Sequence, residues 1–442
     1  MRAGIFLVLA ACGFQHGALS GDATGTDIDA PPPMIDAPPC LSVCSDASTL
    51  NNCVTNLPES CPLGCHAAAA GESDRCSQPV PSNGATVSDL DGVTGDLVIA
   101  QNAVFDSSTG SIVTTGGTTL RGAGAGLSPE HLRFTLIGGN ASVLGVRSLT
   151  IMAGVTLVVT GSHSSIILAG GDIVIEGILD ASANVVGCGL GSQRQCGGPG
   201  GGNGGNLTAD GTGCSPGKAG HDGSGDETGG GGGGFGLPRG GNGGAGDNAG
   251  GAGGGGGCST QPIIPLVGGS GGGGGGHGGV GGGGGGAIQL TALGNVVVKT
   301  PASAATSVIK ANGAGGAKGG SSDAGGGGGA GGAILLEGQS VTIQDARLVA
   351  NAGGGGAGNN GTDGSNGGLT TQPAAGGTGG FAGGAGAARN GSPVDGTGGG
   401  DGTGGGGGGI GRIFINAGSG AYILIGTTVV SPVEYSGVPT TM

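Results

Sequence analysis

Blocks of glycine, separated by short apolar segments, limit what this chain can fold into. Glycine provides 122 of the 442 residues, and the blocks lie between about residue 186 and residue 411. They contain no strict Gly-X-Y repeat, which excludes collagen. Aromatic residues make up 2% of the chain and tryptophan is absent, so a conventional core of large side chains is disfavoured. The fold that remains possible is one of short strands combined with a glycine-rich scaffold.

The charge balance argues against one large class of partners. The chain has 14 basic and 28 acidic residues and a net charge of −14. It has no basic stripe that could pair with phosphates, so we expect no nucleic-acid partner. The acidity is typical of a protein that is kept soluble while exposed.

The eleven cysteines fall into three groups. Cys12 stands alone near the start. The two remaining groups each have an even number of members, as disulfide pairing requires, and therefore indicate an oxidising compartment. The disulfide candidates are Cys40, Cys44, Cys53, Cys61, Cys65 and Cys76 in one group, and Cys188, Cys196, Cys214 and Cys258 in the other.

The first twelve residues have the features of an export signal. Arg2 precedes an apolar run over residues 3–11, which is too short to span a bilayer as a helix. The tetrad Leu9-Ala10-Ala11-Cys12 resembles the lipobox of bacterial lipoproteins, and an ordinary secretory signal with a chance cysteine is the alternative. The resemblance implies cleavage before Cys12, acylation of its thiol and a membrane partner through the lipid. Gly13 after the cysteine is similar to signals for the outer membrane.

Two small regions follow the signal. Residues 13–39 are rich in Asp and Pro and have no apolar periodicity, so we expect a tether. Residues 40–78 have the spacing C-x3-C-x8-C-x7-C-x3-C-x10-C and are too short to bury much core, which predicts a small disulfide module of undetermined connectivity. Zinc is an alternative, although both close pairs are CxxxC. A further alternative is haem, because Cys61 to His66 resembles a CxxxCH haem-attachment variant.

From residue 84 onward the chain has strand chemistry. Runs of three to five aliphatic residues, such as 97–99, 149–151 and 173–175, recur between Gly, Ser, Thr and Asp. A related pattern recurs in four segments that start at Ile166, Ala287, Ala333 and Arg412, and the middle two share the order A-I-x-L, a run that begins with valine (Val296–Val298 and Val341–Ile343), A-N. We therefore predict an all-β fold, a right-handed β-solenoid (parallel β-helix) over 84–442. A β-sandwich is the alternative.

The glycine blocks are then inserts in this solenoid, at about 186–286, 313–333 and 352–411. They could be flexible coils. They could instead order as extended strands that bond side by side, because glycine lacks a Cβ. In composition they resemble the polyglycine-II bundles of phage-tail adhesins and some antifreeze proteins, and also PGRS-type surface proteins, whose N-terminal domain this chain lacks.

Catalytic and metal motifs are weak. Ser270 fits G-x-S-x-G by chance, without the strand and helix that motif needs. Gly243 to Asp247 comes close to a calcium-binding nonapeptide, but the Asp falls one place early. The densest polar cluster in the inserts is His221-Asp222 with Asp226-Glu227, which suits either a cation or a solvated turn. We expect no metal and no cofactor.

Two function classes remain. The first is a non-enzymatic surface lipoprotein of the outer membrane, structural or adhesive, whose partner is a surface glycan or protein. The second is a carbohydrate-active enzyme, a lyase or hydrolase on a β-helix, for which Asp172, Glu176 and Asp180 at a spacing of four would be the carboxylates. Solvent-facing turn carboxylates would explain the same three residues, and with only Tyr422 and Tyr435 the chain offers little aromatic surface for sugars.

Overall fold

The computed structural model describes residues 40–183, 188–223, 225–259, 263–418, 420 and 422–442. Residues 41–442 form one compact unit. The expected signal peptide with Cys12 and the expected tether over 13–39 lie outside the described residues. Within the described residues the elements are strands, apart from two short 3-10 helices, η1 (Val87–Leu90) and η2 (Gln193–Gln195).

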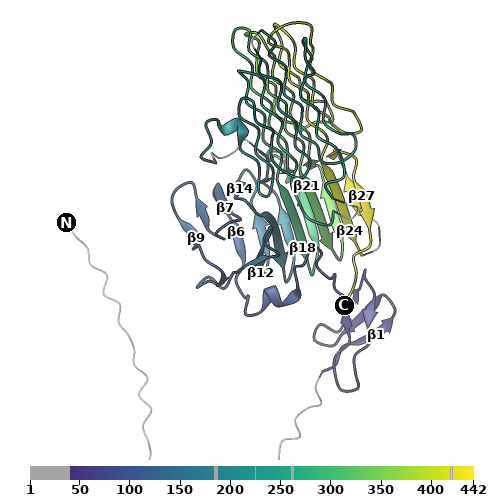
Figure 1. Ribbon diagram of the computed structural model, residues 1–442. Helices are drawn as coiled ribbons and strands as arrows, with labels where there is room; N and C mark the ends of the chain where they lie inside the picture. Colours follow the sequence, from purple (N-terminus) through teal and green to yellow (C-terminus); the bar gives the residue numbers. More distant parts are fainter. Residues whose placement is uncertain (1–39, 184–187, 224, 260–262, 419, 421) are drawn as a thin grey trace, which may run out of the picture. The chain divides into compact units, whose positions relative to one another are not determined.

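Three sheets run along the molecule (Figure 1), and each of them takes one strand from every complete coil. The first has the order β10 (Gly126–Leu127), β11 (Arg133–Ile137), β12 (Ala141–Val146), β15 (Ser164–Ala169), β18 (Ala287–Ala292), β21 (Ala333–Gly338), β24 (Arg412–Ala417) and β27 (Tyr435–Gly437). The second is β25 (Ile423–Ile425), β22 (Val341–Gln344), β19 (Val296–Lys299), β16 (Ile173–Ile175), β13 (Leu149–Ile151) and β6 (Leu97–Ile99). The third is β26 (Val429–Ser431), β23 (Arg347–Val349), β20 (Val308–Lys310), β17 (Ile178–Asp180), β14 (Thr156–Thr160), β7 (Ala103–Asp106), β8 (Ile112–Thr114) and β9 (Thr119–Arg121).

The predicted β-solenoid is confirmed. Successive coils pair in parallel on all three sheets, for example β15 with β18, β16 with β19 and β17 with β20. The four segments with the shared pattern are four successive coils, which begin at β15, β18, β21 and β24. A β-sandwich is excluded because its two sheets would be antiparallel.

Aliphatic columns form the core of the solenoid. In the first sheet, Ile167, Leu290, Leu336 and Ile415 lie in register on adjacent strands and are fully buried. Burying each such side chain contributes about 1.5–3 kcal/mol. The intervening side chains face outward, and a second apolar cluster covers part of that outer face. The short apolar runs of the sequence are therefore sufficient for a core, although large aromatic residues are scarce.

The N-terminal end of the solenoid is closed by antiparallel strands and by one buried cation. The strands β10, β11 and β12 pair antiparallel, as do β7, β8 and β9. The guanidinium of Arg121, a residue that is 1% exposed, donates to the carbonyls of Gly110, Gly122, Gly124 and Gly126. It also lies over the ring of Phe134. Burial lowers the pKa of this guanidinium from its ordinary value.

The disulfide module contains two small antiparallel sheets: β1 (Val43–Asp46), β2 (Thr49–Asn52) and β3 (Leu57–Ser60) in one, and β4 (Cys65–His66) with β5 (Arg75–Cys76) in the other. Disulfides join Cys44 to Cys65 and Cys61 to Cys76, while Cys40 and Cys53 are also disulfide-bonded. Because Cys61 and Cys65 each have a sulfur partner, neither thiol is left for zinc or haem.

The three glycine inserts leave the solenoid at the same corner. They follow β17, β20 and β23, comprise residues 181–286, 311–332 and 350–411, and return to β18, β21 and β24. Each insert begins two to five residues earlier than the glycine content of the sequence indicates. Figure 1 shows the inserts as a single bundle of extended segments beside the sheets. Disulfides Cys188–Cys196 and Cys214–Cys258 lie within the first insert.

Candidate contact surface of the glycine bundle

The inserts bond to one another with a period of three residues. Successive amides of residues 229–234 donate in rotation to three neighbouring segments, residues 241–244, 325–328 and 215–218, and then repeat that order. A polyproline-II backbone has three residues per turn, so every third amide points in the same direction. The hydrogen bonds therefore have the pattern of a polyglycine-II bundle, and they satisfy backbone groups that a packed loop must otherwise leave unpaired.

Segments from different coils meet inside this bundle. The amide of Gly230 in the first insert donates to the carbonyl of Gly325 in the second, at 3.0 Å. Gly328 donates to Gly406 of the third insert at 2.9 Å, and Gly406 donates back to Gly230 at 2.9 Å. The bundle is therefore one structure built by all three inserts.

The close approach of the segments requires glycine. Gly326, Gly327 and Gly328 are consecutive and buried, and an added Cβ would overlap a different segment at each position. At Gly327 it would lie 2.9 Å from the amide nitrogen of Gly232 and closer still to the carbonyl of Gly231. An interior segment has neighbours on every side, so every one of its residues must be small.

On the outside of the bundle, only every third residue needs to be glycine. In the segment Gly361-Thr-Asp-Gly-Ser-Asn, Gly361 and Gly364 are buried while residues 362, 363, 365 and 366 are exposed. Gly217 and Gly220 are likewise buried on either side of the exposed Lys218. The outer segments thus carry a local Gly-x-y repeat, which displays two side chains of every three to solvent. Sequence reasoning looked for this repeat over whole blocks and missed it.

Acidic turns close the end of the bundle that lies away from the solenoid. Turns that include residues 222–223, 225–227, 247–248, 320–323 and 399–402 connect segments there, because the segments that follow run back toward the strands. Amides in neighbouring turns join them, as when Gly402 donates to the carbonyl of Glu227 at 3.0 Å. These turns hold several carboxylates and no Lys or Arg. They give the bundle a negatively charged tip.

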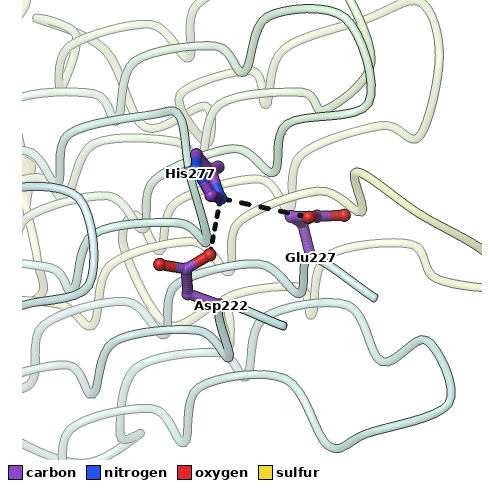
Figure 2. Close-up of side chains that lie close together, drawn as sticks. All are labelled: Asp222, Glu227 and His277. Atoms are coloured by element: carbon purple, nitrogen blue, oxygen red, sulfur yellow. Dashed lines mark ion pairs between the residues drawn. The ribbon is translucent and has the colours of Figure 1, made fainter. Parts of the chain in front are cut away.

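One group of side chains at this tip could hold a cation. Figure 2 shows Asp222, Glu227 and His277, whose ligand atoms lie within 4.8 Å of one another. The Nδ1 of His277 is 2.6 Å from an Asp222 oxygen and 4.0 Å from a Glu227 oxygen. Three such ligands and water can complete a four-coordinate site. Because these three side chains could hold a cation, the absence of a metal that we expect from the sequence stays a prediction.

The structure divides the acidic cluster that the sequence suggested. Asp222 and Glu227 meet His277, which lies far along the chain and on another turn, so no sequence spacing could have linked them. Asp226 instead accepts hydrogen bonds from the amide of Asp247 at 2.8 Å and from the side chain of Asn248. It joins two tip turns to each other.

The three carboxylates considered for catalysis each have a separate structural partner. Asp172 accepts from the amide of Asn295 at 2.7 Å. Glu176 lies 3.2 Å from the Nζ of Lys299, and Asp180 lies 2.8 Å from the Nζ of Lys310. They lie in different parts of one coil, before β16, after β16 and at the end of β17. This geometry does not provide a pair of carboxylates that face one substrate.

Ser270 is a bundle residue rather than a nucleophile. It is fully buried, and its Oγ accepts from the amide of Ser215 at 2.9 Å. It lies on a glycine segment, with none of the strand-to-helix turn that exposes such a serine.

Comparison with known proteins adds no family or neighbour: the chain matches no protein-family model, no curated protein and no solved structure. Within the described residues, no helix has the length and apolar character that crossing a membrane would require.

Proposed function

We propose that this protein is a non-enzymatic cell-surface lipoprotein of the outer membrane, structural or adhesive, which displays the glycine bundle as its contact surface. The observation that carries the proposal is the local Gly-x-y repeat on the outer segments. The backbone of residues 361–367 is held by hydrogen bonds to neighbouring segments, while its intervening side chains face solvent. Such a surface can contact a partner with little loss of backbone entropy, because it is already ordered.

The proposed location of the protein in the outer membrane is inferred from its sequence. Leu9-Ala10-Ala11-Cys12 resembles a lipobox, and Gly13 resembles an outer-membrane signal. The disulfides of the module and of the first insert support an oxidising compartment. Acyl chains on Cys12 would give a stable anchor, since more than one chain is needed for lasting attachment.

The test uses the full chain expressed in a Gram-negative bacterium, with Cys12→Ala as the matched variant. We expect the parent to incorporate labelled palmitate, to fractionate with the outer membrane and to react on intact cells with an amine reagent that cannot enter them. Lys218 and Lys318 on the bundle are exposed and would take this label. Cys12→Ala should lose palmitate and membrane association together. A parent protein without palmitate, or labelled only after lysis, would contradict the proposal.

A further inference from the structure

A pocket lies where the base of the glycine bundle meets the last coils of the solenoid. Its volume is about 450 Å³. Leu237 comes from the first insert and Arg389 with Asn390 from the third, while Arg412 begins β24 and Tyr435 begins β27. The pocket thus forms only when two inserts and the solenoid are assembled, and it is of the size that small ligands occupy.

Two arginines give this pocket a positive charge that no carboxylate balances. Neither Arg389 nor Arg412 forms an ion pair within the described part of the chain, and the described residues that line the pocket include no Asp or Glu. Arg412 is anchored by one donation to the carbonyl of Ser259. The nearby Glu434 accepts from the hydroxyl of Tyr422. In a chain with a net charge of −14, two unpaired guanidiniums in one pocket favour an anionic ligand.

Carboxylate and phosphate are the two anions that guanidinium groups bind best, and the walls of this pocket favour a ligand that carries a carboxylate. An arginine side chain presents a fork of N–H donors that matches the two oxygens of a carboxylate. Arg389 is exposed and its side chain has no hydrogen-bond partner among the described residues, so all of its donors are available. Asn390 adds an exposed amide at the same rim.

The remaining wall of the pocket is apolar and partly aromatic. The ring of Tyr435 is stacked on Phe414, with centroids 6.5 Å apart and planes at 23°, and Tyr435 is nonetheless 47% exposed. Leu237 and Val433 are exposed beside it. A ring that is held by stacking offers a rigid face to the C–H groups of a flat, polar ligand. A sugar ring that bears a carboxylate has both of the required features.

We propose that this pocket binds a uronate residue of an acidic polysaccharide. The carboxylate pairs with Arg389 and Arg412, and one face of the pyranose ring lies against Tyr435. This inference rests on the proposed adhesive function, because it specifies the class of glycan that the surface protein would take. The little aromatic surface that the chain offers for sugars includes Tyr435, which lines this pocket.

The test measures binding of tetragalacturonate to the full-length protein in detergent by calorimetry. The methyl ester of the same oligosaccharide is the matched neutral ligand. We expect tetragalacturonate to bind, the ester to fail, and affinity to fall as salt is added. Arg389→Gln and Tyr435→Ala should each weaken binding by about tenfold or more. Arg75→Gln removes the same charge from an exposed site in the disulfide module and should leave affinity unchanged.

Several results would overturn the inference. They are no binding by the parent, equal binding of the ester, unchanged affinity in Arg389→Gln, or binding of polyglutamate in place of the uronate. Melting temperatures of the variants serve as the folding control. A protein that is lipidated and surface-exposed but ignores the uronate would refute this inference alone. A protein that binds the uronate in detergent but never reaches the surface would refute the proposed function alone.

Discussion

Replacing Gly327 with alanine tests whether the glycine bundle is a packed structure. Residue 327 is buried, its amide donates to Gly273 at 2.9 Å and its carbonyl accepts from Gly282 at 2.9 Å. The new Cβ would lie 2.9 Å from the amide nitrogen of Gly232 and closer to the carbonyl of Gly231, which itself accepts from Gly273 at 2.8 Å. To reach ordinary contact distance the segments must separate by about 1 Å, which stretches those hydrogen bonds.

The magnitude follows from the groups that are disturbed. A buried polar group that loses its partner costs about 1–3 kcal/mol, and overpacking costs about 1–3 kcal/mol. Alanine also lowers the conformational entropy of the unfolded chain, which offsets this loss of stability by about 0.4–1 kcal/mol. We therefore expect Gly327→Ala to lower the free energy of unfolding by roughly 3 kcal/mol.

The control is Gly368→Ala, where an added Cβ meets no described atom within 4 Å and the backbone is not left-handed. We expect its free energy of unfolding to stay within about 0.5 kcal/mol of the parent. Both variants would be titrated with guanidinium chloride, and amide exchange of residues 228–236 and 324–332 would be followed by mass spectrometry. If both variants unfold at the same midpoint, and these amides exchange quickly in the parent, the inserts are not a hydrogen-bonded bundle.

Three further predictions concern other parts of the molecule. Replacing Cys214 and Cys258 by serine opens a disulfide across a sequence separation of 44, and should lower the free energy of unfolding in guanidinium by about 4 kcal/mol; an unchanged midpoint would contradict this. Arg121→Met leaves four carbonyls without their donor, so we expect a loss of about 3 kcal/mol and a lower melting temperature, whereas a melting temperature equal to that of the parent would show that this cation is dispensable. The Asp74 carboxylate accepts from the amide of Cys44 and from a second amide, which lowers its pKa in the folded state, so its contribution to the module is present above the ordinary aspartate pKa and is lost as pH falls through the lowered value. In the parent, the Cys44 amide should therefore become better protected from hydrogen exchange as the pH rises from acid to neutral. In Asp74→Asn its protection factor should not change over this range.

The solenoid could be predicted because its information is local. Runs such as Ile173 to Ile175 consist of β-branched residues at strand length, and their two end side chains are buried while the middle one is not. Recurrence of the same order of runs then indicates coils that stack, since each coil buries its apolar side only against its neighbours. The sequence did not reveal that antiparallel strands and Arg121 close the N-terminal end, because the partners of that side chain are backbone carbonyls.

The arrangement of the inserts could not be predicted in the same way. A glycine segment has no side chains to specify which neighbour it joins, so contacts such as Gly230 with Gly325 have no sequence signal. The group of Asp222, Glu227 and His277 could not be predicted for the same reason, because the register of the glycine segments alone brings His277 to Asp222. The exposure of the outer segments, in contrast, can be recognised in the sequence. Residues other than glycine return at two of every three positions in 361–367, which marks an outer segment with one buried face.

The A-N repeat at the ends of the coils shows how a local signal acquires a structural reason. Asn312 and Asn351 stand where the second and third inserts leave the solenoid, and both are buried. The amide of Asn312 donates to Ser182 Oγ, the amide of Asn351 donates to Asn312 Oδ1, and Ser431 Oγ donates to Asn351 Oδ1. The side-chain amide of Asn351 also donates to the carbonyl of Gly368, in a loop of the bundle. This ladder extends the parallel pairing of the coils by one step and connects it to the glycine segments. The A-N pair therefore recurs at Asn312 and Asn351 because the coils there join two different kinds of backbone at the same corner, where Ser182 has the corresponding place before the first insert.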